Sequence, residues 1–486
     1  MAESKKDIRF RKRRKLMRRT KIMCTIGPAT SSEKMIEALI DEGVDIFRLN
    51  FAHRSQKEIK ENIEIIRKVA SKKETDVAIC LDLQGPKIRV GKVKGGNIYL
   101  KEGETYFLTT EPYLGDKNKS QISYRGFVND VEPGTRVLLD DGKIELNIIK
   151  KYPGEVECKI INGGIIRSNK GVNLPDITLN LDSFTLKDHD DLIFSLNQDV
   201  DWISVSFIRS SKDVEKVREI IDDSGSSARV IAKIEKHEAI TNIDSIIEAA
   251  HGVMVARGDL GVEMPIEDIP KYQKMIINHS NLEGKPVIIA TQMLESMIDN
   301  PRPTRAEAND VANAVYDGAS VVMLSAETAI GKYPTESVQI MSKIINSSES
   351  MIDYGAKMLE KLKISYRSVP DSIALAACEI AKNLNAAAII TSTKSGHTAR
   401  QISKNHPPTL IVAVSPAQRV VNQLKLSWGV YPILSKQSKS IDDMIDSAVN
   451  LALENGFISK GDVVVITAGV LVDKPGTTNM LKVHIV

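Results

Sequence analysis

Cysteine is scarce in this sequence, and its distribution excludes a disulfide-stabilised secreted scaffold. The 486 residues contain four cysteines, Cys24, Cys80, Cys158 and Cys378, which lie far apart and without CxxC spacing. Few, scattered thiols suit a reducing compartment, so we expect a cytoplasmic protein.

Long hydrophobic runs are also missing. No apolar stretch approaches the ~20 residues of a membrane span, and the polar, basic N-terminus lacks the apolar segment of a secretion signal. A hydrophobic share of 42% and a charged share of 27% are ordinary for a globular protein. We expect a chain without membrane contact, long enough for roughly three domains.

Acidic residues are nearly absent from the first part of the chain. Residues 5–21 hold eleven Lys or Arg against one Asp, so this segment carries a charge of +10, whereas the whole chain carries +3. Such an arm (residues 1–19) could bind nucleic acid or an anionic surface, but Phe10 is the one aromatic among its cations, which gives base stacking little support. We favour a solvated arm and do not expect nucleic acid as a partner.

From Thr20 onward, short β-branched runs alternate with amphipathic helical stretches. Eight such strand-helix units occur, with strands in TKIMCTIG, DIFRLNF, DVAICLDLQG, VDWISVSF, ARVIAKIE, HGVMVARGDL, KPVIIATQ and ASVVMLSAE. Alternation of this kind predicts a parallel sheet, and eight units close into a (β/α)8 barrel. Thr304 and Glu307 have the spacing of a capping box at a helix start.

Two further blocks differ from the barrel pattern. Residues 87–182 show short alternating runs separated by turns, which predict a small β-domain inserted after the third strand and lying over the C-terminal face of the barrel. Residues 352–486 alternate again, with strands in AAAIITST, TLIVAVS, VYPILS and DVVVITAG, and predict a separate open α/β domain. The barrel would then comprise residues 20–86 and 183–351.

Polar residues gather where the predicted barrel strands end, which is where such barrels carry their chemistry. These residues are Arg48, Asn50, Asp82, Lys233, Glu235, Arg257, Asp259, Thr291, Ser325 and Glu327. Glu235 and Asp259 follow neighbouring strands, and two carboxylates suit Mg²⁺ with positions left for substrate oxygens. Lys233, Arg48 and Arg89 add the positive charge that a phosphorylated substrate requires.

Other features of these strand ends leave alternatives open. The run ARGDLG offers backbone N–H groups at Gly258 and Asp259 that could hold a substrate carboxylate. Any one polar residue could instead belong to a structural ion-pair layer, although three cations, four acids and two hydroxyls exceed what stability alone needs. His53 is equally compatible with a structural role. No Ser-His-Asp triad and no His/Cys cluster is evident.

At these residues the sequence resembles the pyruvate kinases. IGPAT, RLNFAH, LDLQGPKIR, KGVNLP, AKIEK, VMVARGDLGVE, ATQMLESM, PRPTRAE and LSAET follow that family's motifs in its order, over nearly everything after Thr20. The resemblance implies a (β/α)8 domain, a mobile inserted β-barrel lid, a C-terminal regulatory domain and a homotetramer. It also implies phosphoryl transfer from phosphoenolpyruvate to ADP with Mg²⁺ or Mn²⁺.

The resemblance also implies roles for single residues. Glu235 and Asp259 would hold Mg²⁺, Lys233 would stabilise the phosphoryl group in flight and the enolate, and Arg48 would hold the substrate phosphate. Thr291, with Ser325 and Glu327 nearby, would belong to the relay that protonates the enolate. The nucleotide side would be lined by Pro28, Asn50, His53, Arg89 and, from the lid, Lys170.

One stretch departs from the commonest family pattern. Potassium-dependent members resemble NFSH and LDTKGPEIR, with Asn, Ser and Asp side chains and a Thr carbonyl holding K⁺. Here the corresponding residues are Ala52, Leu83-Gln84 and Lys87, which resemble the potassium-independent branch. We expect Lys87, near Asn50 and Asp82, to replace the ion, so that K⁺ is not required; the alternative is an exposed hinge lysine.

An effector site is a further expectation from the family. The run TSTKSGHTAR is a hydroxyl-rich strand-to-helix turn suited to a phosphate, with Thr393, Lys394, Ser395, His397 and Thr398 as candidates. The closing loop TAGVLVDKPGTTN lacks the Trp and Arg of relatives regulated by fructose bisphosphate, so the effector stays open.

Two competing functions remain at this stage. A Mg²⁺-dependent barrel lyase or aldolase acting on keto acids would also place Glu and Asp on adjacent strand ends, and ATP formation from ADP separates it from the kinase. A nucleic-acid-associated protein would lose binding, but not catalysis, when residues 1–19 are deleted.

Overall fold

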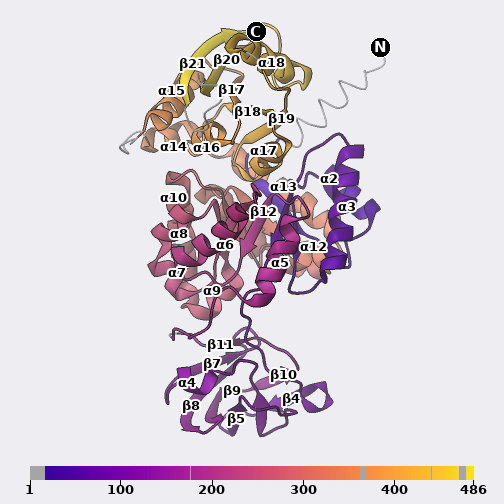
Figure 1. The fold of residues 1–486 in the computed structure, drawn as a ribbon, viewed down its shortest axis with the longest axis vertical. Helices are drawn as coiled ribbons and strands as arrows, with labels where there is room; N and C mark the ends of the chain where they lie inside the picture. Colours follow the sequence, from indigo (N-terminus) through magenta and orange to yellow (C-terminus); the bar gives the residue numbers. More distant parts are fainter. Residues whose placement is uncertain (1–16, 176, 362–367, 439, 470–477) are drawn as a thin grey trace.

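The computed structural model describes residues 17–175, 177–361, 368–438, 440–469 and 478–486 (Figure 1). Three units follow one another along the long axis, with the barrel in the middle, the inserted β-unit at one end and the C-terminal unit at the other. Within the described residues no helix is long and apolar enough to cross a membrane.

The central unit is a closed barrel of eight parallel strands, as the alternation predicts. The strands are β1 (Lys21–Thr25), β2 (Ile46–Asn50), β3 (Ala78–Asp82), β12 (Trp202–Val205), β13 (Arg229–Ile234), β14 (Gly252–Ala256), β15 (Val287–Ala290) and β16 (Val321–Leu324). Closure is made by β1, which pairs with both β2 and β16. All eight strands are almost wholly buried, which explains why they are near-continuous apolar runs.

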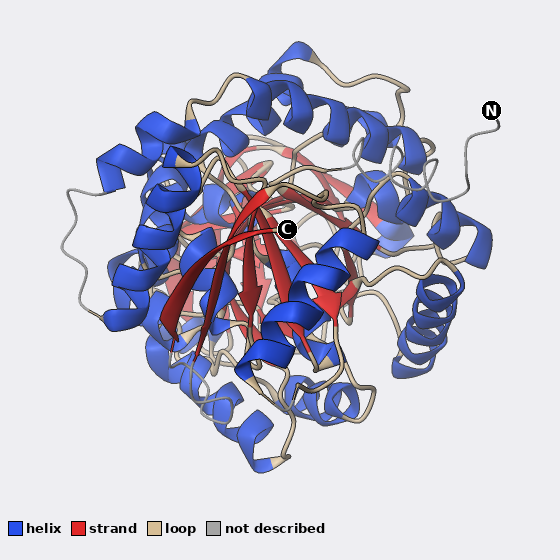
Figure 2. Cartoon of the chain, turned by 90° about the horizontal axis from the view of Figure 1, so that it is seen from above, coloured by secondary structure: helices blue, strands red, loops and turns tan. Residues whose placement is uncertain are grey.

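Helices follow these strands along the chain. Figure 2 looks along the long axis, with the C-terminal unit in front and helices around the rim. The helices of the barrel are α2 (Glu33–Asp41), α3 (Gln56–Lys72), α5 (Leu186–Leu196), α6 (Ser211–Asp223), α7 (His237–Thr241), α8 (Ile243–Ala249), α9 (Arg257–Glu263), α10 (Ile269–Leu282), α11 (Arg305–Asp317), α12 (Ala326–Ala329) and α13 (Pro334–Ser350). The predicted capping box is present at α11, where the Thr304 hydroxyl accepts from the Glu307 backbone N–H and the Glu307 carboxylate accepts from that of Thr304. Ser55 and Thr185 start α3 and α5 in the same way.

The inserted unit is mainly β structure with its own core of buried residues. Its elements are β4 (Asn97–Leu100), β5 (Thr105–Thr109), β6 (Lys119–Gln121), α4 (Phe127–Asp130), β7 (Arg136–Leu139), β8 (Ile144–Tyr152), β9 (Glu155–Asn162), β10 (Gly164–Arg167) and β11 (Val172–Asn173). Six strands form one sheet, with β11 and β6 at its edges, and β4 pairs with β10. Isolated bridges from Arg89 to Gly171 and from Val90 to Ile122 join those two edges, so the closure is barrel-like.

The C-terminal unit contains the four strands that its sequence predicts and one that it does not. Its elements are α14 (Tyr354–Lys361), α15 (Val369–Asn383), β17 (Ala388–Ser392), α16 (His397–Ser403), β18 (Leu410–Ser415), α17 (Gln418–Gln423), β19 (Val430–Leu434), α18 (Ile441–Glu454), β20 (Val463–Gly469) and β21 (Thr478–Ile485). The unpredicted strand, β21, pairs antiparallel with β20 at the sheet edge.

The end of the basic arm is built into the structure instead of being solvated. Arg18 is 3% exposed and forms an ion pair of 3.0 Å with Asp45. The Arg19 guanidinium stacks 4.6 Å from the ring centroid of Tyr354. The expectation of a solvated arm therefore fails for these two arginines, because each has a partner at the contact between the barrel and the C-terminal unit. Residues 1–16 lie outside the described residues.

Candidate active site

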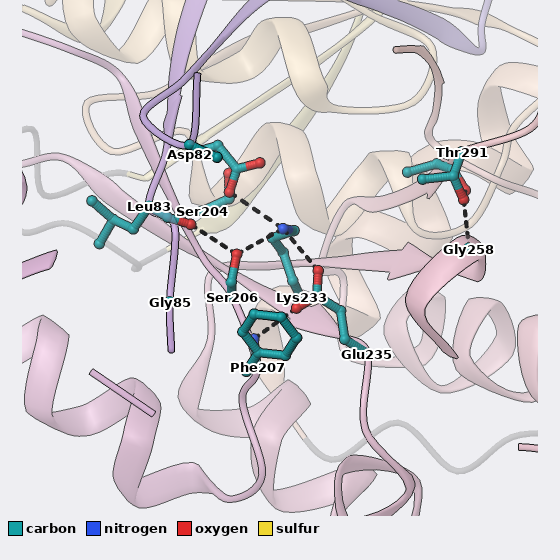
Figure 3. Close-up of polar contacts among 12 residues, drawn as sticks. Asp82, Leu83, Gly85, Ser204, Ser206, Phe207, Lys233, Glu235, Gly258 and Thr291 are labelled. Atoms are coloured by element: carbon teal, nitrogen blue, oxygen red, sulfur yellow. Dashed lines mark hydrogen bonds and ion pairs between the residues drawn. The ribbon is translucent and has the colours of Figure 1, made fainter. Parts of the chain in front are cut away.

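Asp82 and Glu235 converge on the amine of Lys233, at the barrel face that the inserted unit covers (Figures 1 and 3). Lys233 lies in β13, and its Nζ is 2.8 Å from Glu235 Oε1 and 3.5 Å from Asp82 Oδ1. The same amine donates to Ser206 Oγ at 2.7 Å. Three elements therefore fix the position of one ammonium group.

Arg48 reaches the same cluster from β2. Its Nε donates to Asp82 Oδ2 at 2.7 Å, its Nη2 contacts that oxygen as well, and its Nη1 donates to Thr25 Oγ1 at 3.0 Å. Residues Arg48 and Cys80 are partners in the register of β2 and β3, and Asp82 ends β3. The proximity of Arg48 and Asp82 follows from this pairing.

The charges of the cluster hold one another in place. Burial alone would lower the pKa of Lys233, but the carboxylates of Asp82 and Glu235 raise it well above its usual value. The pKa of Asp82 is lowered although burial opposes this, because Arg48 and Lys233 stabilise its anion. Lys233 is therefore a fixed cation, suited to stabilising negative charge and unsuited to accepting a proton at neutral pH.

Glu235 and Asp259 lie close enough for their negative charges to repel each other. Burial, and then the negative charge of Asp259, raise the pKa of Glu235, so a cation between the two carboxylates would relieve a repulsion. In the described part of the chain no three His, Cys, Asp or Glu side chains converge on one point. The donor set therefore fits a hard cation such as Mg²⁺ that takes its other ligands from substrate and water.

The turn after β15 lies beside the start of α9. Thr291 Oγ1 accepts from the Gly258 N–H at 2.8 Å, and Arg257 Nη2 donates to the Thr291 carbonyl at 2.7 Å (Figure 3). Thr291 has a φ of 70°, which is unusual for a β-branched residue. Such backbone strain is kept only where the surroundings fix it, so Thr291 and the N–H of Gly258 form one preorganised edge of the site.

Ser325 and Glu327 follow β16. Both carboxylate oxygens of Glu327 accept backbone N–H groups, from Leu294 at 3.0 Å and from Ser325 at 2.7 Å. Glu327 thereby braces the ends of β15 and β16, and its burial raises its pKa. Ser325 Oγ is buried and has no hydrogen-bond partner among the described residues, which leaves it available to a bound molecule or water.

The residues predicted for the nucleotide side are divided between the two units. Pro28, Asn50 and His53 belong to the barrel, whereas Arg89 and Lys170 belong to the inserted unit. Arg89 Nη1 donates to the Asn169 carbonyl at 3.0 Å, and Lys170 is paired with Asp140 at 2.8 Å. The structure therefore does not bring Lys170 to the barrel face.

Lys87 lies in the first connection to the inserted unit and is exposed. It forms no ion pair within the described residues, whereas Asp82 is engaged by Arg48 and Lys233. The positive charge of Lys87 nevertheless contributes, after burial, to lowering the pKa of His53 at the end of β2. Lys87 thus acts on the barrel face from the hinge without contacting Asp82.

The candidate effector residues surround the turn before α16. Thr393 Oγ1 accepts from the Gly396 N–H at 2.9 Å, and Thr398 Oγ1 lies 2.7 Å from Thr478 Oγ1. The carbonyl of Ser395 faces the barrel, where Arg229 donates to it at 3.0 Å. Lys394 and His397 complete the predicted set. Residues 470–477, which belong to the run TAGVLVDKPGTTN, lie outside the described residues.

Ser206, Thr25 and the backbone N–H of Phe207 are parts of the site that sequence reasoning missed. Ser206 follows the fourth barrel strand, whose end was not among the polar strand ends, and Phe207 N–H donates to Glu235 Oε2 at 2.7 Å. The sequence pattern that identifies Ser206 is the one that identifies the other strand-end residues, because Ser206 is a polar residue directly after a buried strand. Its hydroxyl also donates to the Leu83 carbonyl at 2.8 Å, so it links β3 to Lys233.

Replacing Ser206 with Ala should lower the kcat of the reaction catalysed here about tenfold, because the Lys233 amine loses one of the three groups that position it. Ser204→Ala is the matched control, since that hydroxyl contacts Cys80 and the Leu81 carbonyl and not Lys233. Steady-state kinetics on both variants provide the measurement. Equal kcat values for the two variants would remove Ser206 from the site.

Comparison with family models and comparison with single known proteins give the same result. Residues 17–338 match a family model described as pyruvate kinase, barrel domain, and residues 371–484 match one described as pyruvate kinase, alpha/beta domain. A pyruvate kinase of Staphylococcus haemolyticus is 46% identical over 473 residues, which cover 97% of this chain and 81% of that protein. Those of Staphylococcus aureus and Staphylococcus epidermidis are 46% and 45% identical over 472 residues, with the same coverage.

Proposed function

The chain belongs to the pyruvate kinase family, and we infer from this premise that it transfers the phosphoryl group of phosphoenolpyruvate to ADP at the cluster around Lys233. The products would be pyruvate and ATP. The observation that carries the inference is the single ammonium group held by Glu235, Asp82 and Ser206 beside the Arg48 guanidinium. Family membership also sets aside the lyase and aldolase alternative.

Phosphoryl transfer needs positioning and charge stabilisation more than covalent chemistry. Lys233 and Arg48 would face the transferred group, and the pKa of Lys233 keeps it charged throughout. When the phosphoryl group leaves, negative charge passes to the enolate oxygen, and the same fixed ammonium would stabilise it there. Asp82 holds both Arg48 and Lys233 in place, the first through Oδ2 and the second through Oδ1.

Glu235 and Asp259 would hold the Mg²⁺ ion, or Mn²⁺ in its place. When bound, the ion would neutralise and orient the oxygens of the substrate. The N–H groups of Gly258 and Asp259 would donate to the substrate carboxylate at the start of α9.

The enolate then needs a proton on carbon. Thr291, whose hydroxyl lies between the Gly258 N–H and the Ala290 carbonyl, would line the face from which the proton arrives. The partner-free hydroxyl of Ser325 would hold a water there, and Glu327 would keep the two strand ends in place.

Closure of the inserted unit would complete the nucleotide side. Arg89 and Lys170 would approach the barrel residues of the nucleotide side, which are Pro28, Asn50 and His53. Lys170 would then leave its ion pair with Asp140 and contact the phosphates of the nucleotide. Closure also excludes water, which otherwise competes with ADP for the phosphoryl group. The separate buried core of the inserted unit is compatible with movement as a rigid body.

Several further properties belong to the proposal. The four free, buried cysteines suit the cytoplasm.

Edge strand β21 exposes Val483 and Ile485, which favours pairing between copies and a homotetramer. We also propose the domain boundaries expected from the sequence, which the separate hydrophobic cores support. The turn at Thr393–Thr398 would bind a phosphorylated effector. Lys87 would make K⁺ unnecessary.

Pyruvate formation from phosphoenolpyruvate and ADP, followed before and after removal of divalent metal, tests the proposal. We expect activity with Mg²⁺ or Mn²⁺ and on the order of 1% or less after chelation, since Glu235 and Asp259 would lose the ion between them. Glu235→Gln should raise the Mg²⁺ concentration needed for half-maximal rate. Pyruvate release that needs no ADP, or activity indifferent to chelation, would contradict the assignment.

A further inference from the structure

Four cations gather where the barrel meets the C-terminal unit, on the barrel face opposite the candidate active site. Arg229 begins β13, Arg218 lies in α6, Lys285 precedes β15 and Arg400 lies in α16. Figure 1 shows α16 and α17 on the side of the C-terminal unit that faces the barrel. None of the four forms an ion pair with a carboxylate within the described residues.

Two of these cations are compensated by a helix end. Arg218 Nη1 donates to the Ala249 carbonyl at 2.8 Å, and Lys285 Nζ donates to the carbonyls of Ala250 at 2.7 Å and Glu248 at 3.3 Å. These carbonyls belong to the C-terminal end of α8, where the helix dipole favours positive charge. Arg218 and Lys285 therefore need no further partner.

Arg229 and Arg400 have no such compensation. Nη2 of Arg229 and Nη2 of Arg400 both donate to the Ser395 carbonyl, at 3.0 and 3.2 Å. Nε of Arg229 donates to Gln423 Oε1 at 2.9 Å. Two guanidinium groups thus converge on one neutral oxygen, which satisfies hydrogen bonds but leaves two like charges in a partly desolvated contact.

The electrostatics of the region are consistent with a missing anion. Burial, and then the positive charge of Arg218, lower the pKa of Arg229 to about 10, and burial and Arg229 lower that of Arg400. His251 has its pKa lowered to about 2 by burial and by these cations, and its Nδ1 accepts from the Val230 N–H, so it stays neutral. Asp371, which interacts electrostatically with His397 of α16, is already paired with Lys404.

A narrow cleft lies beside Lys285 and Arg400, and Arg229 is not among the residues that line it. Its lining comes from both units and includes Lys285 and Gly284 from the barrel and Arg400 and Lys404 from α16 and its end. The lining carries three cations, Lys285, Arg400 and Lys404, and no carboxylate among the described residues.

We propose that Arg229 and Arg400 bind a phosphate-type oxyanion at the contact between the barrel and the C-terminal unit. Each guanidinium can donate two parallel N–H bonds to such a group, and a doubly charged oxyanion compensates both arginines together. The ligand class is inorganic phosphate or the phosphate group of a small phosphorylated molecule.

This site is distinct from the two described above. The candidate effector residues present hydroxyls and backbone N–H groups around Thr393 and Thr398, whereas the arginines approach the opposite, carbonyl side of Ser395. The strand-end cluster lies at the other end of β13, four residues from Arg229. The inference therefore does not depend on the proposed catalytic function.

Equilibrium dialysis of the full-length protein with radiolabelled inorganic phosphate tests the proposal. The proteins compared are the wild type, Arg229→Met and Arg400→Met, with Arg218→Met as the matched control. Any phosphate bound at the active site contributes equally to all four, because none of the substitutions touches it. We expect one site per chain to weaken tenfold or more in Arg229→Met and Arg400→Met and to persist in Arg218→Met, since loss of one guanidinium fork removes two charge-assisted bonds.

Circular dichroism establishes that each variant is folded. If a Met variant unfolds, phosphate binding is measured on Arg229→Lys and Arg400→Lys instead. These variants keep the positive charge and lose the two-pronged guanidinium, so we expect them to bind phosphate more weakly than the wild type. Wild-type phosphate affinity in the arginine variants, or equal loss in Arg218→Met, would overturn the site. Competition by a sugar phosphate and by a nucleoside monophosphate, compared between the wild type and Arg400→Met, then separates a phosphorylated metabolite from free phosphate as the ligand.

Discussion

Replacing Lys233 with Met is expected to lower kcat for pyruvate formation about 10³- to 10⁵-fold, the range seen when a cation that stabilises a transferred phosphoryl group is removed. Methionine keeps the length of the side chain, so the change removes the charge that lies 2.8 Å from Glu235 and 3.5 Å from Asp82. Because the pKa of Lys233 is raised, the lost group is a cation at every pH at which the enzyme works.

Loss of a buried cation also affects folding, so the measurement needs a stability control. Removing one partner of a buried ion pair costs about 3–5 kcal/mol, and the thermal unfolding midpoint of Lys233→Met should fall accordingly. Lys236→Met is the matched control, because Lys236 is paired with Glu263 at 2.6 Å and touches none of the reacting groups. The prediction fails if folded Lys233→Met turns over at a rate within tenfold of Lys236→Met.

The sequence predicts the barrel because each strand is buried on both faces and must be a continuous apolar run. The same logic locates the site, since strand ends are where polar residues interrupt these runs. Arg48, Lys233 and Glu235 could therefore be found from the sequence before any contact was known. Ser206 obeys the same rule, because it is the polar residue directly after the buried run WISV.

Other features depend on partners far away in the chain. Strand β21 reads as an ordinary mixed segment, TNMLKVHI, and becomes a strand because β20 offers an unpaired edge. Arg18 and Arg19 look like part of a charged arm, and their burial depends on Asp45 and Tyr354. The positive φ of Thr291 has no local signal, because β-branched residues disfavour it and the surrounding contacts impose it.

Removing the Lys87 ammonium is expected to make the enzyme dependent on potassium. The wild type should form pyruvate at equal rates with and without KCl at matched ionic strength. Lys87→Ala should lose on the order of a hundredfold in kcat without K⁺ and recover part of it when K⁺ is added. A tethered charge supplies the field of a bound ion without the entropy of capturing one, and Ala52 lacks the hydroxyl that a potassium site would use.

The structure sharpens this test, because Lys87 is exposed in the hinge and Asp82 already has two cations as partners. If Lys87 acts, it acts when the inserted unit closes, and its variant should bind phosphoenolpyruvate normally while turning over slowly. Lys92→Ala is the matched control, since Lys92 is an exposed lysine of the inserted unit. Full activity of Lys87→Ala without K⁺ would make Lys87 a hinge lysine only, and a wild type that itself needs K⁺ would show that Asn50 and Asp82 still hold the ion despite Ala52.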